Sequence, residues 1–210
     1  RFITQECRRL SSMIENVLDF SRIEQGRKQY EFEPTDVTAL VEQTVNGMQP
    51  YAAERGVNLV ANVPRSEGEH DPSRQDTAGT LLDGSAIQQA LVNLMDNAIK
   101  HSPSGDEVTV FLEIPNPQSS ILNPQLLLSV QDHGPGIPAA EHEKIFERFY
   151  RLGSELRRET PGVGIGLSIV KHIVEAHGGR VRLESEVGKG SRFTIELPLT
   201  NHQDTKPPRE

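Results

Sequence analysis

The chain has 210 residues, of which 25% are charged and 35% hydrophobic, so it can bury the core of one ordinary domain with a further segment. Its net charge of -8 argues against a nucleic-acid-binding surface, which needs a surplus of Lys and Arg on one face. The single cysteine, Cys7, excludes an internal disulfide framework and favours a reducing compartment. No apolar stretch is long enough to cross a bilayer, and a chain that begins at Arg1 is expected to be part of a longer polypeptide, whose upstream part could hold a membrane anchor.

Residues 1–26 are predicted to form one amphipathic helix, because apolar residues recur at three- and four-residue steps between Ile3 and Phe20. Gly26 is a suitable end for it. A helix of this length cannot bury its apolar stripe alone, so it needs a partner helix, a second subunit or the rest of this chain. The stretch 26–34 resembles a connector, which favours separate units over packing on the rest of the chain.

The remaining residues predict helices and strands without regular alternation. The first expected elements are a helix capped by Thr35 or Asp36 and ending at Gly56, a strand at 57–61 and a mobile loop at 64–80. A short strand at 80–83 then leads to a helix capped by Ser85, which is followed by paired strands at 108–114 and 125–130 joined by a loop. The last expected elements are a helix at 167–177 and a hairpin of residues 180–185 and 191–197. This pattern predicts an α+β fold, a two-layer α/β sandwich with helices over one face of a mixed sheet.

Four short blocks in fixed order carry the functional information. They are residues 93–101, 132–136, 162–167 and 188–193. In each block, small or polar residues stand where backbone must approach an anion or where a polar side chain must reach a base or a metal. Glycine pairs also mark ordinary turns, so it is the ordered set rather than any single block that points to a function.

The first block places Asn93, Asn97 and Lys100 at positions i, i+4 and i+7, which share one helix face. Two carboxamides beside a lysine could hold a hydrated Mg²⁺ ion together with phosphate. An isolated asparagine pair would more simply cap or bridge a neighbouring loop.

The second block sets Asp132 after a strand and before Gly134 and Gly136. A buried carboxylate there could accept a hydrogen bond from an exocyclic amine, which favours adenine over guanine, while the glycines let the base lie on the backbone. An ordinary turn after a strand would account for the same residues.

In the third block, Gly162, Gly164 and Gly166 precede a helix, where free backbone N–H groups attract phosphate. Their spacing differs from the dinucleotide fingerprint, and no strand comes directly before them, so a Rossmann fold is excluded. Between the second and third blocks, Phe149 and its aromatic neighbours could anchor a lid from which Arg148 or Arg151 reaches a terminal phosphate. A solvated loop held by core phenylalanines is the alternative.

As an ordered set, these blocks resemble the N, G1, F, G2 and G3 boxes of the catalytic ATP-binding domain of sensor histidine kinases, in the Bergerat-fold superfamily with gyrase-type ATPases. The resemblance assigns residues 34–199 to that domain and residues 200–210 to a disordered tail. Residues 1–30 are similar to the second helix of the family's dimerisation and histidine-phosphotransfer domain.

The resemblance implies a set of site residues. Asn97 would be the Mg²⁺ ligand, while Asn93, Lys100 and Arg151 would serve catalysis. The implied ATP-binding residues are Asn93, Asn97, Lys100, His101, Asp132, Gly134, Gly136, Ile137, Phe149, Arg151, Gly162, Val163, Gly164, Ile165, Gly166, Leu167 and Ser191. Two of them depart from the family's pattern, because His101 stands where tyrosine is frequent and Ile165 replaces the usual leucine.

The implied activity is transfer of the ATP γ-phosphoryl group to a histidine on an upstream helix outside this chain, for relay to a response regulator. The superfamily's hydrolases have a glutamate base where this chain has Asn93, whose amide cannot take a proton at neutral pH, so phosphotransfer is favoured over hydrolysis. None of the seven histidines matches the family's acceptor pattern.

The implied partners are a second copy, bound through the upstream bundle, and a receiver domain. Nucleic acid is not among them. The chain is expected to be the cytoplasmic portion of a membrane-anchored bacterial sensor, with any membrane contact made by segments outside it. A regulatory module without catalysis, and an ATPase or serine kinase of the same superfamily, are the alternative functions.

Overall fold

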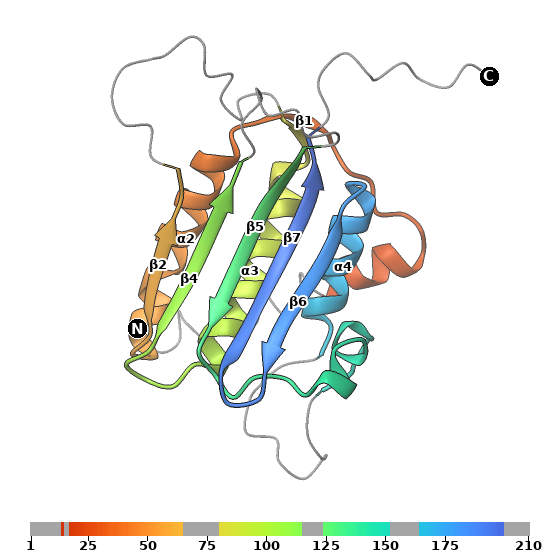
Figure 1. The fold of residues 1–210 in the computed structure, drawn as a ribbon. Helices are drawn as coiled ribbons and strands as arrows, with labels where there is room; N and C mark the ends of the chain where they lie inside the picture. The colour runs from red at the N-terminus through yellow and green to blue at the C-terminus, as the bar shows by residue number, and fades with distance from the viewer. Residues whose placement is uncertain (1–13, 15–16, 65–79, 115–123, 152–163, 200–210) are drawn as a thin grey trace, which may run out of the picture.

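The computed structural model describes residues 14, 17–64, 80–114, 124–151 and 164–199. Its main feature is a five-stranded sheet with three helices on one face, so the predicted α+β two-layer sandwich is confirmed (Figure 1). In spatial order the strands are β2 (Asn58–Asn62), β4 (Glu107–Glu113), β5 (Gln125–Asp132), β7 (Gly190–Pro198) and β6 (Arg180–Glu186). The β2–β4 pair is parallel, whereas every other neighbouring pair in this sheet is antiparallel. The helices are α2 (Val37–Glu54), α3 (Gly84–His101) and α4 (Gly166–Ala176).

Several small elements complete the described part of the chain. A two-stranded antiparallel sheet joins β1 (Glu33–Thr35) to β3 (Thr80–Leu82). Two short 3-10 helices, η1 (Ala139–Glu141) and η2 (Lys144–Phe146), follow the loop after β5. Residues 17–24 are helical, in agreement with the predicted first helix. The expected mobile loop at 64–80 and the expected tail fall mainly on residues 65–79 and 200–210, outside the described residues.

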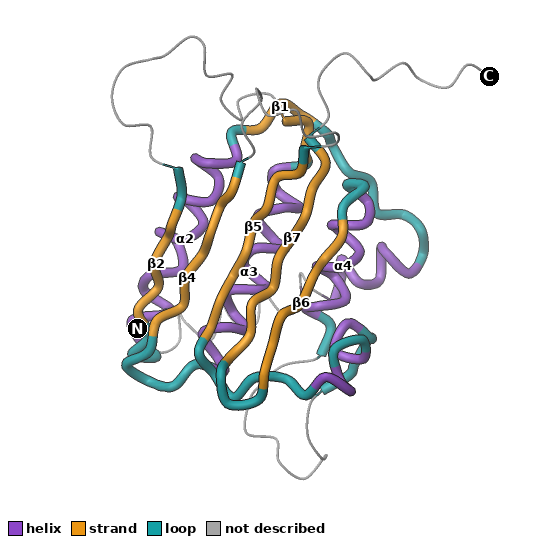
Figure 2. Tube along the Cα trace, in the orientation of Figure 1, coloured by secondary structure: helices purple, strands orange, loops and turns teal. Residues whose placement is uncertain are grey.

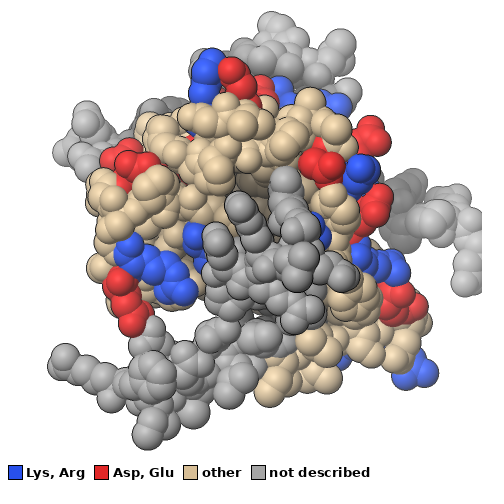
Figure 3. All heavy atoms as spheres, turned by 90° about the horizontal axis from the view of Figure 1, so that it is seen from below, with Lys and Arg blue, Asp and Glu red and all other residues tan. Residues whose placement is uncertain are grey.

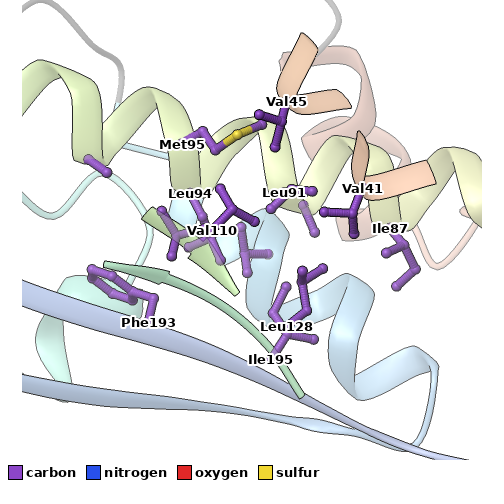
Figure 4. Packing of buried hydrophobic residues seen from close by; sticks show 14 of the residues in the cluster. Val41, Val45, Ile87, Leu91, Leu94, Met95, Val110, Leu128, Phe193 and Ile195 are labelled. Carbon is purple, nitrogen blue, oxygen red and sulfur yellow. The ribbon is translucent and has the colours of Figure 1, made fainter. Parts of the chain in front are cut away.

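The core lies between the sheet and α3, because α3 turns its apolar stripe toward the strands. Ile87, Leu91 and Leu94 on this helix are at most 1% exposed. Figure 4 shows Leu91 and Leu94 pointing toward the strand residues, and Met95 pointing toward Val45 of α2. Each such side chain contributes about 1.5–3 kcal/mol on removal from water, so α3 is held mainly by packing.

The helix starts are fixed by aspartate side chains. Asp36 accepts a hydrogen bond from the Ala39 backbone N–H at 3.0 Å and caps α2, as one of the two predicted residues. The prediction that Ser85 caps α3 is wrong. Asp83 is the cap and accepts from the Ala86 N–H at 3.0 Å, whereas the Ser85 hydroxyl lies inside the helix and donates to Asp83 Oδ1 at 2.7 Å.

The segment between the first helix and β1 packs on the sandwich. The rings of Tyr30 and Phe32 lie 5.5 and 4.9 Å from that of His177 at the end of α4. The Glu31 N–H donates to Asp83 Oδ2 at 3.1 Å. His177 accepts from the Asp83 N–H through Nε2, and burial lowers its pKa below 6.5. This segment is therefore attached to the start of α3 and to the end of α4.

The helical residues 17–24 also contact the sandwich, beside α4 in Figure 1. The Phe20 ring meets that of Phe149 edge to face at 5.5 Å, and Glu24 forms an ion pair with Arg148 at 2.5 Å. The first helix therefore packs on the rest of the chain, which is the arrangement that the sequence disfavoured. No helix among the described residues is both long and apolar enough to cross a membrane.

The face of the sheet opposite the helices is polar. Glu196 of β7 is only 4% exposed, and it pairs there with Arg180 and Arg182 of β6 at 2.5 and 3.6 Å. Farther along the face, Arg192 pairs with Glu113 at 3.1 Å. Glu196 is paired with arginines of the neighbouring strand β6, and Arg192 reaches across β5 to Glu113 of β4, so opposite charges meet on this face.

Candidate functional site

The predicted site residues converge at one end of the sandwich. The end of α3, the end of β5, the start of α4 and the β6–β7 turn all lie at the lower end of the sheet in Figure 1. Figure 2 shows loops joining these elements there. Residues as far apart in the chain as Asn93 and Ser191 therefore reach one region, as they must if they bind one ligand.

Asp132 is the most buried acidic residue of this region, with 6% of its surface exposed. Its Oδ1 accepts backbone N–H groups from Gly134 at 2.9 Å and Ser191 at 3.3 Å. From the described residues, no hydrogen bond reaches Oδ2. Burial raises the pKa of this carboxyl above its ordinary value, and the two backbone N–H groups oppose the rise.

Glycines are required around Asp132 because backbone approaches closely. A Cβ on Gly134 would lie 2.6 Å from the carbonyl oxygen of His101, so the end of α3 touches the loop after β5. A Cβ on Gly136 would lie 2.1 Å from the Glu186 carbonyl oxygen, and one on Gly190 would lie 2.1 Å from that of Asp132. Both of these glycines also have positive φ, at 70° and 93°. Main-chain atoms thus surround the loop that follows the carboxylate.

The face of α3 that carries Asn93, Asn97 and Lys100 borders the start of α4. Asn93 is 8% exposed, and a Cβ on Gly166 would meet its Oδ1 at 3.5 Å. Asn97 and Lys100 are half-buried along the same helix. The first and third sequence blocks are therefore in contact.

Lys100 has a partner that was not predicted from the sequence. Its ammonium donates to Asp96 Oδ2 at 2.5 Å, and the Tyr51 hydroxyl of α2 donates to Asp96 Oδ1 at 2.5 Å. The i, i+4 spacing of Asp96 and Lys100 was a visible signal for the ion pair. The contribution of Tyr51 was not visible, because it depends on how α2 packs on α3.

The segment at 149–151 contacts Gly164 of the third block. The Phe149 N–H donates to the Gly164 carbonyl at 2.9 Å, and Phe149 itself has a positive φ of 60° and is 61% exposed. The Tyr150 hydroxyl donates to Glu141 of η1. Arg151 follows with its Cγ 3.2 Å from the Cβ position of Gly164.

His101 lies close enough to these charges to be affected by them. It keeps an exposed surface, yet desolvation of its ring lowers its pKa, and the cations Lys100 and Arg151 act in the same direction. Asp132 and Asp96 oppose the shift. The pKa of this imidazole is therefore affected by charged residues of the first block, of the second block and of the segment that contains Arg151.

The remaining predicted residues have mixed placements. The Ile137 N–H donates to the Ser185 hydroxyl at 2.8 Å, and Ser185 lies 3.0 Å from the hydroxyl of Ser191. Ser185, which joins the loop after β5 to β6, was not predicted from the sequence. Ile165 is 3% exposed and belongs to the core, with Leu167 packed beside it. Gly162 and Val163 lie outside the described residues.

Charges of both signs surround this end of the molecule. In Figure 3, which views it from below, Lys and Arg alternate with Asp and Glu around the visible rim. The described part of this face therefore has no single basic patch of the kind that binds nucleic acid.

Comparisons with known proteins identify the family of the chain. The family model described as "Histidine kinase-, DNA gyrase B-, and HSP90-like ATPase" matches residues 82–201. The circadian input-output histidine kinase CikA of Synechococcus elongatus is 33% identical over 190 residues, which are 90% of this chain and 23% of that protein. The sensor histidine kinase WalK of Bacillus subtilis is 30% identical over 203 residues, 96% of this chain and 31% of that protein.

Solved structures share the fold. Full-length ShkA, in complex with AMPPNP, superposes with a TM-score of 0.71 at 28% identity and covers 92% of this chain, which matches 36% of that one. The mycobacterial sensor histidine kinase MprB has a TM-score of 0.61 at 28% identity, over 81% of this chain and 99% of that one. With more than half of its residues matched by the family model, the chain belongs to the histidine kinase-, DNA gyrase B- and HSP90-like ATPases, and its relatives are sensor histidine kinases.

Proposed function

We propose that this chain is the ATP-binding catalytic portion of a sensor histidine kinase, which transfers the γ-phosphoryl group of ATP to a histidine. The chain spans less than a third of the length of CikA and WalK, so the activity of the whole protein is part of the proposal. The proposed acceptor is a histidine outside the seven positions of this chain, because none of these has the acceptor pattern.

The observation that carries the proposal is the carboxylate of Asp132. Asp132 is only 6% exposed as a residue, and a carboxylate oxygen of it that receives no hydrogen bond from the described residues remains available to a donor on a ligand. Oδ2 of Asp132 is such an acceptor, and the backbone around Gly134 and Gly136 leaves no room for side chains. An amine on a flat base fits both properties, which favours adenine.

The other residues of this end suit a triphosphate. The α4 N-terminus, preceded by Gly164, presents main-chain N–H groups toward anions. The amide oxygen of Asn97 suits Mg²⁺, which takes few protein ligands and completes its shell with phosphate and water. When bound, the ion neutralises phosphate charge. We assign Lys100 and Arg151 to the phosphates as charge partners.

Phosphotransfer is favoured over hydrolysis by Asn93. Its side chain lies where α3 meets Gly166, close to the proposed phosphate site. A carboxamide has no basic site at neutral pH, so it cannot take a proton from water. The site can then promote the reaction only by positioning the reactants and by neutralising charge, and both effects act on any acceptor that is delivered to the γ-phosphate.

The partners follow from the same proposal. The exposed apolar residues Ile14, Val17 and Leu18 of the first helix suit a helical bundle with a second copy. A response-regulator receiver domain would take the phosphoryl group from the histidine. We also propose a cytoplasmic location, with any membrane anchor supplied by other segments.

The test is transfer to a separate acceptor. We would incubate the chain with γ-labelled ATP, Mg²⁺ and a dimeric helical bundle that carries the acceptor histidine of a curated relative. We expect slow labelling of the bundle, because tethering normally supplies the effective concentration, and almost no label on the chain itself. The label should be lost in acid, since phosphohistidine is acid-labile.

Two results would contradict the proposal. An acid-stable label on the chain would indicate a serine kinase, and release of free phosphate without labelled bundle would indicate an ATPase. The Asp132→Asn variant is the negative control, and Asp106→Asn, a substitution of the same type in the loop after α3, is its matched positive control.

A further inference from the structure

A short chain of hydrogen bonds links α2 to the proposed phosphate site. Tyr51 of α2 donates to one oxygen of Asp96 at 2.5 Å, and Lys100 donates to the other at 2.5 Å. Both oxygens of one carboxylate are thus used, one by each helix. Asp96 thus connects Tyr51 to Lys100.

The Tyr51 end of the chain is held firmly. Its ring packs against the hydrophobic core, and the guanidinium of Arg55 lies 4.1 Å from the ring centroid. The two helices are joined nearby through the buried pair Val45 and Met95. The packing of the ring on the core and on Arg55 therefore restricts the direction in which the Tyr51 hydroxyl points.

The Lys100 end is the opposite case. A lysine side chain has many rotamers, and fixing it costs conformational entropy. The Lys100 side chain is nevertheless only 20% exposed, and the contact with Asp96 selects one position for its ammonium. An ammonium has three donors, so the bond to Asp96 leaves two for phosphate oxygens.

We propose that Asp96 and Tyr51 are positioning residues for Lys100, with Tyr51 orienting the Asp96 carboxylate and the carboxylate placing the ammonium where phosphate binds. The inference rests on the proposed function, since it takes Lys100 to be a phosphate contact. It assigns to α2, which supplies none of the predicted site residues, a role in phosphate affinity.

Tyr51→Phe is the decisive variant because it removes only the hydroxyl and changes no charge. We would measure the affinity of the variant and of the natural chain for adenosine and for Mg·ATP by calorimetric titration. We expect Mg·ATP affinity to fall by about threefold to tenfold, the scale of coupled neighbouring groups, while adenosine affinity stays unchanged. A structural role would instead weaken both ligands alike.

The Lys100→Ala background tests whether the effect passes through Lys100. There, Tyr51→Phe should cause no further loss of Mg·ATP affinity, because the group that it orients has gone. Tyr30→Phe is the matched control, since Tyr30 is also a partly buried tyrosine but lies in the segment before β1. It should leave both affinities unchanged.

The outcomes separate this inference from the proposed function. If the natural chain binds Mg·ATP and Tyr51→Phe binds it equally well, or if the two losses add in the double variant, the positioning role is overturned and the proposed function stands. If the natural chain binds neither ligand, the proposed function itself fails.

Discussion

The two oxygens of Asp132 have different surroundings. Oδ1 is bonded within the fold and affects its stability, whereas Oδ2 is available for a ligand. Oδ1 accepts two backbone N–H groups, whereas Oδ2 receives no hydrogen bond from the described residues. Burial raises the pKa of the carboxyl above 3.8, so the folded chain holds this proton more tightly than the unfolded chain. Ionisation of Asp132 therefore lowers the free energy of unfolding as the pH rises through the raised pKa, and below pH 3.8 the penalty is absent.

Asp132→Asn should keep the acceptor at Oδ1 and remove the buried charge. We expect the free energy of unfolding at pH 7 to be equal to or above that of the natural chain, with the gain disappearing as the pH falls toward 3.8. ATP affinity should fall at least about tenfold, because the new amide can present a donor to the adenine amine. Urea unfolding across this pH range and ATP titration measure the two effects. Unchanged ATP affinity in a folded variant would remove Asp132 from the site.

Alanine substitutions at Gly188 and Gly190 distinguish the cost of a steric clash from the cost of backbone strain. Both have positive φ in the same turn, at 82° and 93°. A Cβ on Gly188 meets no atom within 4 Å, but one on Gly190 would lie 2.1 Å from the Asp132 carbonyl oxygen. We expect Gly188→Ala to cost about 1 kcal/mol from left-handed strain alone. Gly190→Ala should cost about 2–4 kcal/mol, because the loop must also move. Equal losses in urea unfolding would contradict the close approach.

At the scale of elements, the sequence located nearly every helix and strand, since the periodicity of buried residues is local information. Two details depended on contacts between elements and were missed. β1 is three residues long and contains Pro34, so it has no periodicity, and it exists only through its pairing with β3. Ser85 and Asp83 are both good helix caps by type, and pattern alone does not fix a helix start to within two residues.

The cap of α3 gives a direct test of that correction. Asp83→Ala removes the acceptor of the Ala86 N–H and of the Glu31 N–H, and we expect it to cost about 1–2 kcal/mol. Ser85→Ala removes only one bond to Asp83 and should cost less than about 1 kcal/mol. The free energy of unfolding of both variants decides the order. A larger loss for Ser85→Ala would restore Ser85 as the cap.

At the scale of the whole molecule, the docking of residues 17–24 is a tertiary contact that no local pattern encodes. The same apolar stripe suits a partner helix, a second copy or the sandwich, so the sequence alone could not choose. The parallel pairing of β2 with β4 was equally hidden, because strand patterns do not specify neighbours. The sequence blocks do lie together at one end of the sandwich, and the binding roles assigned to their residues stay predictions.

Phe20→Ala should weaken the attachment of the helical residues 17–24 to the sandwich. This change removes the ring contact with Phe149 and the cation–π contact with Arg148, together about 1 kcal/mol. We expect amide hydrogen exchange of residues 17–24 to become about fivefold faster, while exchange in α3 and β5 stays unchanged. Leu18→Ala is the control, because Leu18 is 52% exposed on the same helix. Equal acceleration in α3 would mean that the helix supports the core.

The paired charges on the open face of the sheet also affect the edge strand β6. In the described part of the chain, β6 has a neighbour only on one side, so its other edge presents unpaired backbone groups to any strand that approaches. Its outward side chains are Arg180, Arg182, Glu184 and Glu186, all exposed. A second molecule that added a strand there would have to bring its own side chains beside this row of charges. The same residues that hold Glu196 in place therefore protect the protein from edge-to-edge aggregation at high concentration.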